Sequence, residues 1–86
     1  MALVPMCVEP GELLTTCEHE EDVDYNQLWT VPDYPIDGVQ LDYGDLMMVI
    51  SCCDDYGLMP ATLLHLRTNR LLFIDDVKSE GWLFRP

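Results

Sequence analysis

Four cysteines and two histidines are the residues of this chain best suited to metal binding or nucleophilic chemistry. Cys17 and His19 lie close together, and Cys52 and Cys53 are adjacent, so the four could offer ligands to one zinc ion. The C-x2-C and H-x3-H spacings of structural zinc sites are nevertheless absent. Reduced thiols are the favoured interpretation, because nothing indicates an oxidising compartment and adjacent cysteines need separate disulfide partners. Zinc stays the alternative, and we expect no metal or cofactor.

Catalytic chemistry has no positive support in the pattern. Acid–base catalysis needs carboxyl groups whose pKa values are pushed apart in a pocket, and a chain of 86 residues has little room to build one. His65 lies in an apolar run, and we interpret it as a half-buried strand residue on the outer face rather than a base. No serine or cysteine has a recognisable histidine partner, and phosphate-binding and calcium loops are absent. We therefore expect a non-enzymatic protein without catalytic residues.

The charge of the chain is its most unusual property. The formal net charge is -12, and residues 1–66 contain no lysine or arginine. The four basic residues are Arg67, Arg70, Lys78 and Arg85. Solubility needs only roughly 2–8 charges in a small domain, and self-repulsion opposes compaction, so we expect a partner that uses the charge. Because a polyanion repels nucleic acid and anionic membranes, the expected partner is the basic surface of a nucleic-acid-binding protein.

Aromatic side chains are interspersed with the acidic residues of the first half. Tyrosine and tryptophan are enriched at binding hot spots, and acidic residues on a rim attract a basic partner. These rings either pack the core or form an interface, and the sequence leaves both open. The predicted partner-binding residues are Glu18, Glu20, Glu21, Asp22, Asp24, Tyr25, Trp29, Asp33, Tyr34 and Asp37.

Short apolar runs bounded by turn residues predict β-strands throughout the chain. The expected strands are residues 13–17, 46–51, 61–66, 71–74 and 81–84, with a further short strand at 28–31 as an option. Residues 67–70 would turn the chain into a hairpin, and residues 75–80 fit a turn or a short 3-10 helix. The charge block at 18–24 predicts a solvated loop. We therefore expect one domain spanning residues 1–86, a mainly β, five-stranded, half-open barrel with a long acidic loop.

The run Tyr43-Gly44-Asp45-Leu46-Met47-Met48-Val49-Ile50 resembles SH3-like barrels, in which a Gly-Asp step commonly leads into an apolar strand. The resemblance covers residues 43–86 and implies a hairpin, a 3-10 turn and a short closing strand after that first strand. The chain lacks the paired tryptophans and the Pro-x-x-Tyr signature of signalling SH3 domains, so proline-rich peptide binding is not carried over. Barrels of this kind also look like the short accessory proteins of bacteriophages.

These observations lead to one main functional hypothesis and one alternative. The first is an acidic protein-binding module that inhibits or modulates a nucleic-acid-handling protein by occupying its basic groove, as a nucleic-acid mimic. The alternative is a structural or regulatory subunit docked through an apolar strand edge, at residues 71–74 and 82–84. Apolar runs are far shorter than the roughly 20 residues that span a membrane, and no signal peptide is evident, so we expect a cytoplasmic location. The partner and the oligomeric state are left open.

Overall fold

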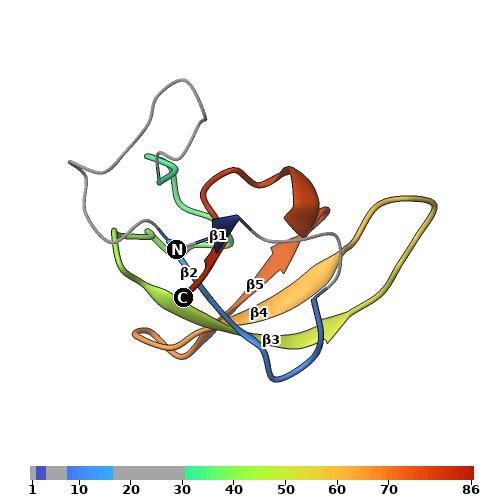
Figure 1. The fold of residues 1–86 in the computed structure, drawn as a ribbon. Helices are drawn as coiled ribbons and strands as arrows, with labels where there is room; N and C mark the ends of the chain where they lie inside the picture. The colour runs from blue at the N-terminus through green and yellow to red at the C-terminus, as the bar shows by residue number, and fades with distance from the viewer. Residues whose placement is uncertain (1, 4–7, 17–30) are drawn as a thin grey trace.

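The computed structural model describes residues 2–3, 8–16 and 31–86, and the described chain is mainly β (Figure 1). Its strands are β1 (Ala2–Leu3), β2 (Leu13–Thr15), β3 (Leu46–Cys52), β4 (Ala61–His65), β5 (Arg70–Ile74) and β6 (Phe84–Arg85). The 3-10 turn η2 (Val77–Ser79) is the one helical element among the described residues. Within those residues, no helix is long and apolar enough to cross a membrane.

All six strands belong to one antiparallel sheet with the order β1-β6-β2-β3-β4-β5. The outermost strands, β1 and β5, are not paired with each other within the described residues, so the sheet stays open. This confirms the prediction of a small, mainly β, half-open architecture. The sheet has six strands rather than five because two-residue strands at both ends of the chain pair with one another, Leu3 opposite Phe84.

The central strands follow the predicted apolar runs closely. A turn at residues 66–69 joins β4 to β5, where the Asn69 N–H donates to the His65 carbonyl (2.7 Å) and Asn69 takes a left-handed φ of 58°. The predicted hairpin is therefore confirmed. The closing strand is shorter than expected, since residues 81–82 form a turn and the strand begins only at Phe84. The optional strand at 28–31 lies largely outside the described residues.

The core lies on the inner side of the curved sheet. Strand β4 alternates between buried and half-buried residues, which places Ala61, Leu63 and His65 on the inner side. The C-terminal segment completes the core, because Trp82 is 5% exposed, Leu83 0% and Phe84 2%. These three residues are therefore not available as the docking end that the alternative hypothesis gave to residues 82–84.

The opposite side of β2–β5, here called the outer face, is apolar and solvent-exposed. Directly paired residues of antiparallel strands point to the same face. The pairs Leu13–Met48, Met48–Leu64 and Leu64–Leu71 therefore form one row across four strands. Exposures of 41–62% are retained by Leu13, Leu46, Ile50, Leu66, Leu71 and Phe73. The outer face is made of these six residues with Met48, Thr62 and Leu64.

Candidate functional site

Three of the predicted partner-binding residues lie in the described part of the chain. Asp33, Tyr34 and Asp37 are all exposed, and Tyr34 retains 64% of its accessible surface. This exposure excludes core packing for Tyr34. The remaining predicted residues lie outside the described residues: Glu18, Glu20, Glu21, Asp22, Asp24, Tyr25 and Trp29.

Asp37 is positioned by a tight turn that lies against the edge of β5. Ile36 and Val39 exchange two backbone hydrogen bonds of 2.9 Å, and the residues between them both have positive φ, 50° at Asp37 and 80° at Gly38. Such a turn favours Asp-Gly, because each residue tolerates the left-handed conformation. The Asp37 carboxylate accepts the Phe73 N–H at 2.7 Å. This hydrogen bond satisfies a backbone N–H on the outer edge of β5, the side that has no partner strand among the described residues.

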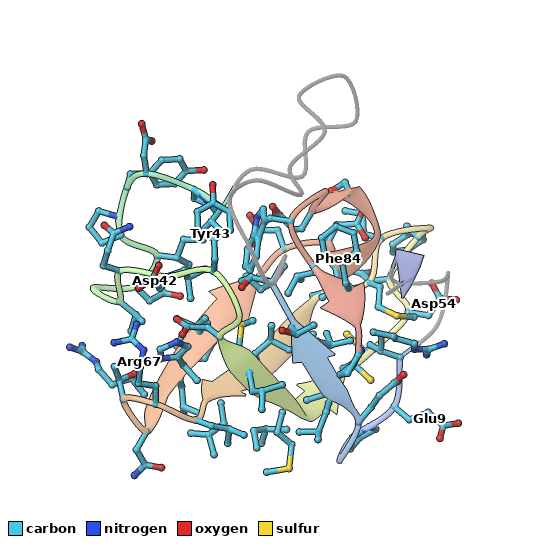
Figure 2. The ribbon with its side chains drawn as sticks, turned by 60° about the vertical axis from the view of Figure 1, so that its left-hand side comes forward. Glu9, Asp42, Tyr43, Asp54, Arg67 and Phe84 are labelled. Carbon is cyan, nitrogen blue, oxygen red and sulfur yellow. The ribbon has the colours of Figure 1, made fainter. Side chains whose placement is uncertain are left out.

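The exposed carboxylates of the described residues are not confined to one side of the molecule. Asp42 lies on the side where the 31–45 segment folds, whereas Glu9 and Asp54 lie on the opposite side (Figure 2). All three are exposed. Acidic surface is therefore available on at least two sides of the domain.

A buried polar cluster, unforeseen from the sequence, lies where β3 begins and β4 ends. The Asp45 side chain is 8% exposed and His65 is 0% exposed, with 2.7 Å between Asp45 Oδ2 and His65 Nε2. Arg67 donates to the same carboxylate from Nε (3.1 Å) and Nη2 (3.0 Å). This bidentate pair fixes the orientation of both side chains. The Asp42 N–H donates to Asp45 Oδ2 at 2.9 Å. The interpretation of His65 as an outward-facing, half-buried residue was wrong.

Two threonines fix the backbone beneath this cluster. The Thr16 hydroxyl donates to the Asp42 carbonyl (2.8 Å) and accepts the Asp45 N–H (3.1 Å). The Thr15 hydroxyl donates to the Asp45 carbonyl at 3.0 Å. Both threonines are buried, so each hydroxyl satisfies backbone groups that would otherwise be costly to desolvate.

The electrostatics of the cluster favour an ionised Asp45. Burial by itself would raise the pKa of Asp45, but hydrogen bonds from Arg67, His65 and the Asp42 backbone outweigh it and leave that pKa below its ordinary value of 3.8. The same contact with Asp45 raises the pKa of the Arg67 guanidinium. A carboxylate held in this way acts as a fixed anion inside the fold.

The geometry around His65 suits a structural role better than a catalytic one. Its Nδ1 lies 2.6 Å from Thr68 Oγ1, so both ring nitrogens are already bonded within the protein. A general base must reach the proton that it removes, and His65 has no exposed surface. The Asp45–His65–Thr68 chain therefore links β3, β4 and the β4–β5 turn.

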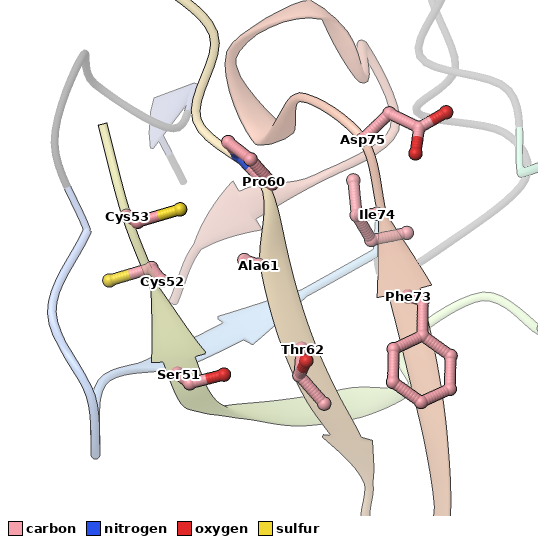
Figure 3. Close-up of a pocket in the computed structure, with 9 residues that line it drawn as sticks. All are labelled: Ser51, Cys52, Cys53, Pro60, Ala61, Thr62, Phe73, Ile74 and Asp75. Carbon is pink, nitrogen blue, oxygen red and sulfur yellow. The ribbon is translucent and has the colours of Figure 1, made fainter. Parts of the chain in front are cut away.

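The cysteines of the described residues do not converge on one point. A hollow of about 400 Å³ at the ends of β3, β4 and β5 includes Cys52 and Cys53 in its lining (Figure 3). The two sulfurs point to opposite sides of the backbone in Figure 3, as consecutive residues of an extended chain do. Cys52 Sγ lies 3.2 Å from the Val8 carbonyl. No group of three or more metal-binding side chains occurs among the described residues, while Cys17 and His19 lie outside them.

Comparisons of the chain with protein-family models, with curated proteins and with solved structures give no match.

Proposed function

We propose that this chain is a non-enzymatic acidic binding module that acts in the cytoplasm by occupying the basic groove of a nucleic-acid-handling protein. Carboxylates on a folded surface can take the place of phosphates and displace counterions from lysine and arginine in such a groove. The SH3-like resemblance and the likeness to bacteriophage accessory proteins belong to the same proposal.

The observation that carries the proposal is that two of the three arginines form ion pairs within the chain. Arg67 binds Asp45 through two nitrogens and donates to the Gln40 carbonyl at 3.1 Å. Arg85 pairs with Glu12. These two cations are therefore committed within the chain and do not offset other exposed carboxylates, among them Asp33, Asp54, Asp55 and Asp75.

Tyr34 adds an anchor to this acidic surface. Tyr34 is 64% exposed and is preceded in sequence by the exposed Asp33, with the exposed Asp37 three residues further on. Tyrosine is enriched at binding hot spots, and nearby acidic residues would attract a basic partner. The segment 33–37 is therefore the described part of the proposed interface.

The experiment is affinity capture from the native cell with the full chain as bait, at low and at high salt, with duplex DNA as competitor. Capture should fall steeply with salt and be displaced by DNA, because both compete for the same cations. Replacing Glu20, Glu21, Asp22 and Asp24 together by lysine should abolish capture, and the double variant D33N/Y34A should reduce it. Capture that is unchanged in these variants and insensitive to salt would refute the proposal.

The alternative, a subunit docked through an apolar strand edge, keeps partial support. Leu71 and Phe73 of β5 are 46% and 62% exposed. The Asp37 carboxylate nevertheless blocks the Phe73 N–H on that edge. Capture that hardly responds to salt and is lost in F73A would favour this alternative over the acidic interface.

A further inference from the structure

We propose that the outer face is a self-association surface, on which two copies of this chain pack sheet against sheet as a weak, reversible dimer. The inference does not depend on the proposed acidic interface, although the two surfaces meet at the edge of β5, where the Asp37 carboxylate accepts the Phe73 N–H.

The first support is the absence of charge from the outer face. No Asp or Glu occurs within β2, β3, β4 or β5, although the chain carries 16 acidic residues. The only basic residue in these strands is Arg70, which is paired with the inward-facing His65 and therefore points to the other side. Two copies with a net charge of -12 each would repel strongly through any acidic surface. None of the nine residues of the outer face is acidic, so contact through this face would bury no carboxylate of its own.

The second support is the size of the apolar surface. Six side chains with exposures of 41–62% offer on the order of 500 Å², near the upper end of the patches found on monomers. Two such faces together bury roughly 1,000 Å², the lower bound for a specific interface. The area therefore fits a weak dimer rather than a permanent one.

The third support is the regular geometry of the row Leu13–Met48–Leu64–Leu71. A two-fold axis through the middle of this row would place Leu13 of one copy near Leu71 of the other, and the contact would be self-complementary. Open sheets pack face to face at about 10 Å with interdigitating apolar side chains. The Leu and Met side chains of the row suit such packing.

The test is sedimentation equilibrium of the full chain from micromolar to millimolar concentration, at low and at high NaCl. We expect a reversible monomer–dimer equilibrium that becomes tighter at high salt, because salt screens the repulsion between the two polyanions. Higher salt should strengthen the dimer but weaken capture of a basic partner. Each proposal can therefore fail without the other.

Leu71→Lys is the test variant, and Leu58→Lys is its matched control. Leu71 lies in the row and is 46% exposed, whereas Leu58 lies outside the sheet, in the β3–β4 connection, and is 50% exposed. Both substitutions make the same change in net charge. L71K should weaken the dimer at least about tenfold by burying an unpaired ammonium group, and L58K should leave it unchanged. Circular dichroism would verify that both variants are folded. A monomer throughout the concentration range at both salts, or equal weakening by the two variants, would overturn the proposal.

Discussion

His65 Nε2 lies 2.7 Å from Asp45 Oδ2, and the two residues, twenty positions apart, are both buried. Asp45 immediately precedes β3 and His65 ends β4, so their contact fixes the paired strands at one end of the sheet. Arg67 and the Asp42 N–H complete the coordination of the carboxylate. Removal of Asp45 should therefore affect the buried His65, the Arg67 side chain and the Asp42 backbone at once.

We expect Asp45→Ala to lower the free energy of unfolding by about 3 kcal/mol, because it leaves the buried His65 without its carboxylate partner. Asp45→Asn should cost less, since an amide oxygen can still accept the Asp42 N–H. Urea unfolding monitored by tryptophan fluorescence measures both. Asp33→Asn, an exposed substitution, should stay within about 0.5 kcal/mol of the unmodified chain. Equal losses for the buried and the exposed site would contradict the proposed role of the cluster.

Stability should also depend on pH through Asp45. Its folded-state pKa lies below 3.8, so the ionised carboxylate stabilises the fold above that pH. This contribution is lost as the pH falls below 3.8 and passes through the folded-state pKa. Urea unfolding can be measured from about pH 6 to about pH 2, a range that spans the ordinary titration of carboxyl groups. Over this range the free energy of unfolding should fall more in the unmodified chain than in D45N. Parallel curves for the two proteins would show that Asp45 does not contribute in this way.

Thr16→Val should cost about 1–3 kcal/mol although the side-chain shape is conserved, since the Asp42 carbonyl and the Asp45 N–H both lose the hydroxyl and keep only their long 3.3 Å hydrogen bond to each other. Thr62→Val is the control, because Thr62 is a half-buried strand residue where a β-branched apolar side chain fits. In thermal unfolding, the melting temperature of T16V should be well below that of T62V. A melting temperature for T16V equal to that of the unmodified chain would mean that the backbone groups find other partners.

Asp37→Gly should expose the Phe73 N–H to exchange while keeping the left-handed turn, because glycine tolerates the φ of 50°. Asp37→Asn retains an acceptor and the turn, so it serves as the matched variant. Amide hydrogen exchange by NMR should be roughly tenfold faster at Phe73 in D37G, equivalent to one hydrogen bond, and closer to the unmodified rate in D37N. Unchanged exchange in D37G would show that another group protects this amide.

The strands were predictable where an apolar run is bounded by clear turn residues. β3, β4 and β5 agree with the predicted runs to within one residue, because Gly44-Asp45, Pro60 and Arg67–Asn69 mark their limits. β1 was missed and β6 was placed too early, since a two-residue strand carries no periodic signal and exists only through its partner.

The candidate site was harder to predict for two physical reasons. The run Leu63-Leu64-His65-Leu66 does not alternate in polarity, so the inward side of β4 is undefined until its neighbours are known. The partner that makes a buried histidine acceptable, Asp45, lies in a different predicted element. The exposure of Tyr34 could not be distinguished from core packing either, because tyrosine suits both environments.

The position of β6 has a consequence for biosynthesis. β6 follows every other described strand in the chain, yet it lies between β1 and β2 in the sheet. A ribosome therefore releases β1 and β2 long before the segment that must insert between them exists. The central hairpin of β4 and β5 can form during synthesis, whereas closure around Phe84 must wait until residues 84–85 have emerged. Pairings across such long sequence separations are slow to form, so the sheet is completed only after translation of β6.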